Sequence, residues 1–329
     1  MSIKIAFHDN TITVRGSSVA VYDYAHYNEQ LLGNLSIIIS PYTDATDRAA
    51  LVRFTKRFPV FHYSTPDELE EILQRERCDI LYCIKYGKDD GVKSNRIKTV
   101  IHCVFDMTQP HGDVYAAVSS TLATKFNKTL FVPHMISLSP VPVPTSTYRD
   151  SLPEDAVVFG RYGGMDTMDL LFCWRAIELV LKSHTNIYFL FANTPQQLLH
   201  PNIKYVDKLL TEDDKRRFIY SCDAYIECSS MGHTFGLAMG EFSICGKPII
   251  AYRGYALHYD YALPGITGNM WTSAHIEILG NKGIYYQDEK EFYHILTSFR
   301  KRAENGDLNA YRDYTPERVM SKFKQVFIS

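Results

Sequence analysis

Short apolar runs rich in β-branched residues alternate with stretches of helical spacing from the amino terminus onward. In the first half of the chain, these runs occupy 3–7, 36–40, 79–84, 99–105 and 129–133. Between two of them, Thr65, Pro66 and Glu68 supply an N-cap, a proline for the first helical turn and a capping-box acid, which predicts a helix running toward Arg77. Strands that alternate with helices are typical of a parallel, doubly wound α/β sheet.

A proline-rich segment at 138–147 interrupts this alternation. Its three prolines remove backbone donors and favour an extended connector. The pattern then resumes, with predicted strands at 156–160, 186–191, 202–206 and 224–228 and predicted helices at 170–182 and after Thr211. We therefore expect two domains, 1–140 and 154–312, joined by a linker at 141–153. A last helical pattern at 313–329, opened by Thr315 and Pro316, has an apolar face that another element must cover.

The composition excludes several classes of protein. The chain has 35 basic and 37 acidic side chains and a formal net charge of −2, and no basic stripe makes nucleic acid an expected partner. The amino terminus carries Asp9 and lacks the basic and apolar regions of a secretion signal, and no apolar run reaches the ~18–20 residues of a membrane span. Seven cysteines without C-x-x-C spacing indicate reduced core residues. These features predict a cytoplasmic protein.

Common metal-binding motifs are missing from the sequence. The twelve histidines are scattered, and neither H-E-x-x-H nor a strict D-x-D occurs. We therefore expect chemistry that uses no metal ion and no cofactor.

The stretch at 232–251, G-H-T-F-G-L-A-M-G-E-F-S-I-C-G-K-P-I-I-A, carries the most informative pattern. It follows a predicted strand, opens a helix near Gly236 and ends in another strand that begins at Pro248. Glycine at a helix mouth lets a ligand approach the backbone, and the free amides of the first turn together with the helix dipole favour a phosphate. Glu241, further along this helix, suits hydrogen bonds from a ribose diol. The local pattern fits equally well a structural role in which Gly236 and Gly246 serve helix–strand packing.

This stretch resembles the signature of a large family of retaining glycosyltransferases, the glycosyl transferases group 1 or E-x7-E family. The family pattern reads E-G-F-G-L-x-x-x-E, followed by A-x-x-x-G-x-P-V-I-A. The first glutamate of that pattern is His233 in this chain, and the next glycine is Thr234. In the family the first glutamate touches hydroxyl groups of the donor sugar, so the resemblance makes His233 the residue that selects the sugar. The matching positions are Phe235, Gly236, Leu237, Glu241, Gly246 and 248–251.

The resemblance implies the GT-B architecture, in which two Rossmann-like α/β domains face each other across a cleft and a C-terminal helix returns to the N-terminal domain. V-V-F-G-R at 157–161 is similar to the family strand that ends in a phosphate-binding arginine. Arg161 is therefore the candidate for the donor diphosphate and for catalysis, since a guanidinium fork binds phosphate oxygens bidentately. The lysine that the family has about five residues later is missing, which leaves Lys247 or Arg253 to supply its charge. The alternative for Arg161 is a surface arginine that caps a strand end.

In the first half, V-I-H-C-V-F-D at 100–106 resembles the family strand that ends in a histidine at the cleft, and 113–120 resembles a later strand. By this resemblance His102 faces the donor sugar and is a second catalytic candidate. A histidine inside an apolar strand is more commonly a core residue, and this alternative stays open.

Polar residues also surround the end of the first strand. Arg15 and Gly16 lie in the loop before the first helix, where the resembling family has glycines close to phosphate and acceptor. Gly16 is a donor-side candidate and Arg15 an acceptor-side candidate. His8, Asp9 and Asn10 follow the strand directly, at the end that lines the cleft in open α/β sheets, so we expect them on the acceptor side.

The activity that the resemblance implies is transfer of a hexose or pentose from a nucleotide diphosphate sugar to a hydroxyl group of a glycan or glycoconjugate. Configuration would be retained, and no metal ion would be needed. Two alternatives stay open. A nucleotide-sugar 2-epimerase shares the two-domain plan, and a non-catalytic sugar-nucleotide-binding or scaffold protein would tolerate His233 and the missing lysine. Peripheral contact with a membrane is compatible with the sequence, which does not indicate an oligomeric state.

Overall fold

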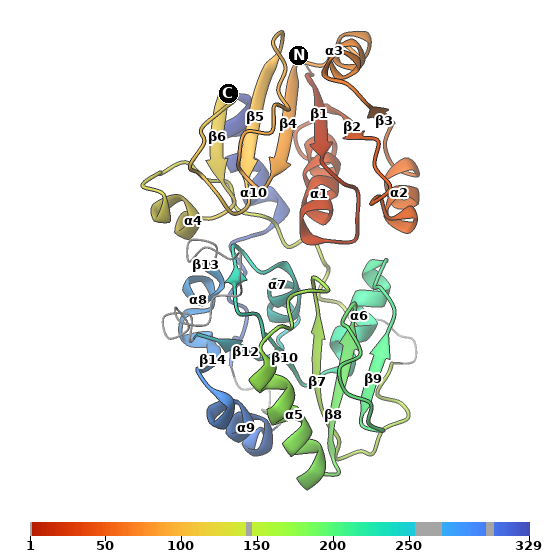
Figure 1. Cartoon of the computed structure of the whole chain (residues 1–329), viewed down its shortest axis with the longest axis vertical. Coiled ribbons are helices and arrows are strands. Elements are labelled where there is room, and N and C mark those ends of the chain that lie inside the picture. The colour runs from red at the N-terminus through yellow and green to blue at the C-terminus, as the bar shows by residue number, and fades with distance from the viewer. Residues whose placement is uncertain (1, 143–146, 254–271, 301–305) are drawn as a thin grey trace. The chain divides into compact units, whose positions relative to one another are not determined.

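The computed structural model describes residues 2–142, 147–253, 272–300 and 306–329. They form two compact units, each built on its own six-stranded sheet (Figure 1). The first unit comprises Met1–Ser137 and Asp313–Ser329, and the second comprises Leu138–Arg312. The last helix of the chain therefore belongs to the same unit as the N-terminal strands.

The sheet of the first unit has the strand order β3-β2-β1-β4-β5-β6, and all neighbouring strands run parallel. The run at 129–133 is not a strand, so that prediction is wrong: only Phe131 forms an isolated bridge, to Ala117. Pro133 has no amide hydrogen to continue a ladder. The sequence pattern does not reveal β3, because four residues are too few to show a period. The strands are β1 (Lys4–Asp9), β2 (Leu35–Pro41), β3 (Val60–Tyr63), β4 (Ile80–Lys85), β5 (Lys98–Cys103) and β6 (Val114–Ala117).

Helices cover this sheet through two separate core clusters. Ile5 and Phe7 belong to the cluster with α1, α2 and α10, whereas Ala6 belongs to the cluster with α3 and α4, as the alternation of side chains along a strand requires. The apolar face of α10 is covered by these contacts, with the Phe323 ring stacked on Phe7 at a centroid distance of 6.2 Å. The helices are α1 (Gly16–Gln30), α2 (Arg48–Thr55), α3 (Pro66–Arg75), α4 (Ser120–Lys125) and α10 (Pro316–Phe323), which a π-helical turn (Lys324–Ile328) extends.

The start of α3 is the one that the sequence predicts. The Thr65 hydroxyl accepts a hydrogen bond from the amide of Glu68 at 3.2 Å, and Pro66 occupies the first turn. The helix ends at Arg75, just before Arg77 adopts a left-handed backbone with φ of +53°.

The sheet of the second unit has the order β14-β12-β10-β7-β8-β9, again with parallel neighbours. All four strands predicted for 154–228 are present, although the last of them, β10, has three residues. A separate two-residue parallel pair joins β11 to β13. The strands are β7 (Val157–Tyr162), β8 (Ile187–Ala192), β9 (Ile203–Val206), β10 (Ala224–Ile226), β11 (Gly232–His233), β12 (Ile249–Tyr252), β13 (Thr272–Ser273) and β14 (Gly283–Tyr286).

The helix that the sequence predicts after Thr211 begins with a side-chain cap. Thr211 and Asp214 form a complete capping box, in which each side chain accepts from the other residue's amide at 3.1 Å. The helix predicted near Gly236 is α7, and it stops at Ile244 before Gly246 turns the chain with φ of +70°. The helices are α5 (Leu171–Ser183), α6 (Glu212–Ser221), α7 (Leu237–Ile244), α8 (Ala274–Leu279) and α9 (Glu289–Ser298), and a 3-10 turn (Gly280–Lys282) follows α8.

Both sheets have a point at which the direction of the strand order reverses. It lies between β1 and β4 in the first unit and between β7 and β10 in the second. Ligands of open α/β sheets bind outside the carboxyl ends of the strands at such points. The polar residues at the carboxyl ends of these four strands are therefore the ones to inspect for function.

Three histidines of the first unit make its stability depend on pH. Burial lowers the pKa of His8 and His102 to about 4 and that of His134 to about 3. An unfolded chain protonates histidine near pH ~6.5, so it binds more protons than the folded chain between roughly pH 6.5 and 4. Burial also raises the pKa of Asp9 to about 6, which offsets part of this effect.

We expect the free energy of unfolding to fall on acidification from about pH 7 to about pH 5 by on the order of several kcal/mol. Urea titrations of the intact chain at several pH values measure it. A free energy of unfolding that stays constant or rises over this window would show that these histidines are not held neutral.

Candidate functional site

Arg161 lies at the carboxyl end of β7, beside the reversal point of the second sheet. Its side chain is buried, with 1 % of the residue exposed. The guanidinium donates to the Thr194 hydroxyl at 2.6 Å, to the Gly164 carbonyl at 2.9 Å and to the Thr167 hydroxyl. Among the residues that the structure describes, no carboxylate lies within 4.0 Å of it. A buried cation with only neutral partners costs free energy, and an anion bound there would remove that cost.

The arrangement differs from that of a surface arginine capping a strand end, because the loops after β7 and β8 enclose the guanidinium. Asn193 stabilises the first loop by donating to the Gly163 carbonyl at 2.7 Å, although its own backbone has a φ of +49°. The sequence analysis missed Thr167 and Thr194. Thr194 lies two residues after the end of β8, which is a signal for a strand-end residue, whereas Thr167 lies five residues after the end of β7.

No side chain caps the N-terminus of α7, so backbone amides of its first turn are available to an acceptor group of a ligand. Gly236 has φ of +88°, and a Cβ there would lie 2.6 Å from the methyl group of Met239 and 3.1 Å from the Tyr311 hydroxyl. Glycine is therefore needed for both backbone conformation and packing. Phe235 is buried, and its ring packs edge-on against the Tyr311 ring. The Phe235 carbonyl accepts a hydrogen bond from the Tyr311 hydroxyl at 2.8 Å. Thr234 is also buried, and Leu237 begins the helix.

Glu241 lies one turn into α7 and is buried, with 6 % of the residue exposed. Its Oε1 lies 2.5 Å from Nζ of Lys215 in α6, and its Oε2 accepts from the Tyr162 hydroxyl at 2.5 Å. Each carboxylate oxygen still has a further lone pair, so a ligand hydroxyl has acceptors available. Lys215 was not predicted from the sequence, because no motif joins it to Glu241 and only the fold brings α6 and α7 together.

His233 ends β11, three residues before Gly236, and 23 % of its side chain is exposed. Its Nε2 lies 3.3 Å from Oε1 of Glu227, which follows β10 and is 1 % exposed. The ring of His275 packs edge-on against His233 at a centroid distance of 5.4 Å. Glu227 was not predicted from the sequence either, because it directly follows an apolar strand and no motif marks it.

Comparisons with known proteins identify the fold of the chain. No protein-family model and no curated protein matches it. Among solved structures, HepE from Anabaena in complex with UDP and glucose matches with a TM-score of 0.67 at 12% identity, covering 98% of each chain. A glycosyltransferase from Rickettsia africae matches with a TM-score of 0.62 at 13% identity, covering 99% of this chain and 94% of that one. WaaB, a lipopolysaccharide outer core galactosyltransferase, matches with a TM-score of 0.63 at 12% identity, covering 98% and 99%.

The chain has the GT-B fold. The predicted class, α/β with two Rossmann-like domains, is thereby confirmed. At these sequence identities, structural similarity establishes the fold alone. Any activity has to be argued from the side chains of this chain.

Two residues, Lys247 and Arg253, were considered as substitutes for the lysine that the resembling family has after its phosphate-binding arginine. They lie in different places in the second domain. Lys247 precedes β12 and donates to the Cys222 carbonyl at 2.7 Å, so it lies at the amino-terminal edge of the sheet and not at the Arg161 edge. The expectation that it could serve the diphosphate is therefore corrected. Arg253 directly follows β12 and is exposed, with its guanidinium 5.5 Å from the Tyr285 ring centroid.

His102 lies one residue before the end of β5, but its side chain is buried in the first GT-B domain. It is completely buried, and its Nδ1 lies 2.7 Å from the Tyr82 hydroxyl while its Nε2 lies 2.8 Å from the Val132 carbonyl and 3.2 Å from that of Ala117. The Phe327 ring of the C-terminal segment covers it. Both ring nitrogens have partners, which favours the alternative that His102 is a core histidine, and its catalytic role stays a prediction.

The carboxyl end of β1 carries the acceptor-side candidates. Nε2 of His8 lies 2.8 Å from the Tyr63 hydroxyl, and its Nδ1 is buried without a partner in the described structure. Asp9 is 3 % exposed and accepts from the Thr11 amide at 3.2 Å, while its Oδ2 is likewise buried without a partner. Asn10 donates to Asp90 at 3.4 Å. Nδ1 of His8 and Oδ2 of Asp9 are each a buried polar group without a described partner at the carboxyl end of β1.

Arg15 and Gly16 lie apart from these buried atoms, at the exposed start of α1. Arg15 is the N-cap residue in an extended conformation, and its side chain makes no capping hydrogen bond. Gly16 does not have a positive φ, so the backbone does not require glycine there. Its role on the donor side remains a prediction.

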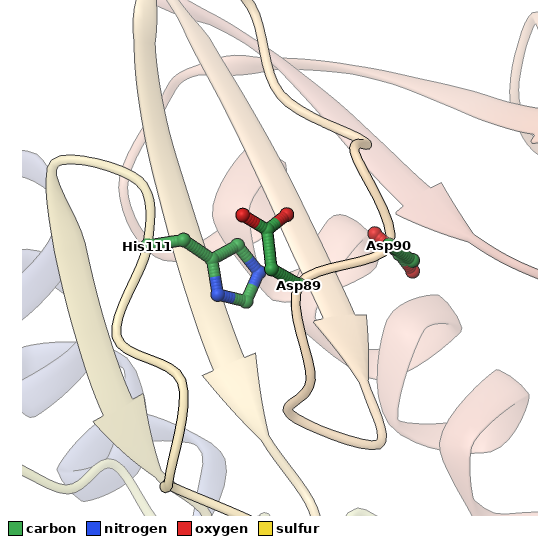
Figure 2. Close-up of side chains that lie close together, drawn as sticks. All are labelled: Asp89, Asp90 and His111. Carbon is green, nitrogen blue, oxygen red and sulfur yellow. The ribbon is translucent and has the colours of Figure 1, made fainter.

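One group of side chains in the described part of the chain has spacing that suits a metal ion. Ligand atoms of Asp89, Asp90 and His111 lie within 4.8 Å of one another on two loops of the first domain (Figure 2). Oδ1 of Asp90, however, lies 2.5 Å from Nζ of Lys85, whose side chain is 1 % exposed. A bound cation would stand next to this buried ammonium, so we do not assign a metal ion to the group. None of the described helices combines the length and the apolar character needed to cross a membrane.

Proposed function

We propose that the second domain binds the diphosphate of a nucleoside diphosphate sugar and that the chain transfers the sugar to an acceptor hydroxyl with retention of configuration. The observation that carries the proposal is Arg161, a buried guanidinium with three neutral partners and no described carboxylate within 4.0 Å. A diphosphate supplies the missing negative charge, and guanidinium–phosphate hydrogen bonds are among the strong ones. HepE, which shares the fold, is a UDP complex, so UDP-sugars are the first donors to test.

The other donor-side residues have complementary roles in this proposal. The uncapped first turn of α7 at Gly236 and Leu237 offers backbone amides to the phosphates. Glu241, with Lys215 beside it, accepts hydrogen bonds from the ribose diol. His233 contacts a hydroxyl group of the sugar, in the place that a glutamate occupies in the resembling family. Gly16 remains a donor-side proposal on that resemblance alone.

Chemically, the bond between the anomeric carbon and the diphosphate oxygen breaks, and a bond to the acceptor oxygen forms. The acceptor's proton passes to the leaving diphosphate, so no nucleophile of the protein is needed. Arg161 and the amides of α7 stabilise the charge that develops on the diphosphate, which makes preorganised electrostatics the main catalytic effect. His8, Asp9, Asn10 and Arg15 are proposed on the acceptor side, where the buried free oxygen of Asp9 suits a glycan hydroxyl.

Two other functions compete with transfer. A non-catalytic sugar-nucleotide-binding protein would keep Arg161 while losing the family glutamate and lysine, as this chain has done. A 2-epimerase would act on the nucleotide sugar without an acceptor, and no described acid–base pair in the second domain favours it over transfer.

One assay separates the three functions. Incubated with UDP-glucose, UDP-galactose or UDP-N-acetylglucosamine and no acceptor, a transferase should slowly release UDP, because water replaces the acceptor. A binding protein would release none, and an epimerase would convert the sugar without releasing UDP. Since the proposed charge stabilisation comes from Arg161 and backbone amides, we expect UDP release to continue in excess EDTA. Loss of turnover in EDTA and its recovery with manganese or magnesium would contradict that assignment.

A further inference from the structure

Glu227 is a buried carboxylate with an unusual set of partners. Its Oε1 accepts from the Ser229 amide at 2.6 Å, and its Oε2 accepts from the Tyr252 amide at 3.0 Å. Among the described residues, no lysine or arginine lies within 4.0 Å of it. Burial raises the pKa of Glu227, but the hydrogen bonds from His233 and from the Ser229 amide oppose burial, and the pKa lies below its ordinary value. Glu227 is therefore an anion inside the second domain.

The two neighbouring histidines are not equivalent partners for this anion. His275 is completely buried, and burial lowers its pKa to about 4, so it is neutral near pH 7. His233 points its Nε2 at Oε1 of Glu227, 3.3 Å away, and 23 % of its side chain is exposed. A carboxylate only accepts hydrogen bonds, so the nitrogen that faces it must carry the hydrogen. In the neutral ring, the opposite nitrogen, Nδ1, is then the one with a lone pair.

We infer that Glu227 is a positioning residue, which fixes His233 in the Nε2–H tautomer and so offers the Nδ1 lone pair to a hydroxyl group of the donor sugar. The inference rests on the proposed function, since it assigns the sugar contact within that donor site. A glutamate at position 233 would offer only acceptors to the sugar, and the Glu227–His233 pair offers an acceptor as well. The buried carboxylate thus restores, through an imidazole, the hydrogen-bonding character that the missing glutamate would have had.

Nitrogen NMR of the intact chain labelled with ¹⁵N-histidine tests this directly. His233→Gln identifies the His233 signals by their loss. We expect a pyrrole-like shift for Nε2 and a pyridine-like shift for Nδ1 in the free protein at neutral pH. An Nδ1–H tautomer, an equal mixture of tautomers or an imidazolium with both nitrogens protonated would overturn the inference. On addition of UDP-glucose the Nδ1 resonance should move further than on addition of UDP.

Two matched variants separate the positioning contact from the sugar contact. Glu227→Gln should lose the tautomer preference of His233 while the affinity for UDP changes by less than about twofold, since the nucleotide contacts lie elsewhere. Glu227 is buried, and if this substitution prevents folding, His233→Asn takes its place. The Asn amide can occupy the place of Nδ1 but cannot reach Glu227. This variant should weaken the binding of UDP-glucose more than the binding of UDP. Equal effects of His233→Asn on the two ligands would refute the sugar contact, whereas failure of the wild type to bind UDP and every UDP-sugar would refute the proposed function instead.

Discussion

Replacing Arg161 by Gln should weaken the binding of UDP by roughly two to three powers of ten. Hydrogen bonds to charged groups contribute about 1.5–3 kcal/mol each, and a guanidinium fork can make two to a diphosphate. Arg161→Lys should recover only part of the affinity, because an ammonium keeps the charge and loses the planar fork. Calorimetric titration of UDP into each variant measures the effect. The matched control is Arg175→Gln in α5, whose side chain is 64% exposed and pairs with Glu289.

The same variant also tests the structural alternative for Arg161. A buried guanidinium without an anionic partner costs stability in the free protein. Arg161→Gln should therefore unfold at about the same temperature as the wild type, or higher, when no nucleotide is present. If the variant instead binds UDP normally and loses stability, Arg161 serves only to hold the loops after β7 and β8.

Replacing Glu241 by Ala should weaken UDP binding by about 1.5–3 kcal/mol, the range for hydrogen bonds to a charged group. The loss should be smaller for 2′-deoxy-UDP, because that ligand lacks one of the hydroxyl groups that Glu241 is proposed to accept from. Tyr162→Phe is the control, since it removes the 2.5 Å hydrogen bond to Oε2 and leaves the carboxylate in place. It should bind UDP nearly as the wild type does.

Glu241 also neutralises Lys215, so its removal affects stability as well as binding. Comparing the two ligands separates the effects, because lost stability weakens both to the same extent. Equal losses for UDP and 2′-deoxy-UDP would remove Glu241 from the ribose site.

The sequence predicted those parts of the fold that depend on local chemistry. Thr65 and Thr211 are caps that accept from amides three residues further on, and Gly236 and Gly246 occupy positions with positive φ, so local spacing was enough to place α3, α6 and α7. The run at 129–133 failed because it pairs with β6 only around Ala117, and Pro133 has no amide hydrogen to extend the pairing.

The candidate site was harder to predict for the same reason. Lys215 is 26 residues from Glu241 along the chain, and Glu227 has the appearance of a strand residue until its amide and histidine partners are seen. His102 fits a strand-end motif, yet its environment is set by Tyr82 and by the C-terminal Phe327, which no local pattern connects to it.

The proposed function requires the second domain to bind a nucleoside diphosphate sugar through Arg161. Thermal unfolding of the wild type and of Arg161→Gln, with a panel of nucleoside diphosphates and their sugars, tests it most directly. A ligand at ~100 times its dissociation constant adds ~2.7 kcal/mol of stability. We predict that at least one member of the panel raises the unfolding temperature of the wild type and does so far less in Arg161→Gln. A panel in which no member stabilises the wild type, or in which the variant is stabilised equally, would contradict the account.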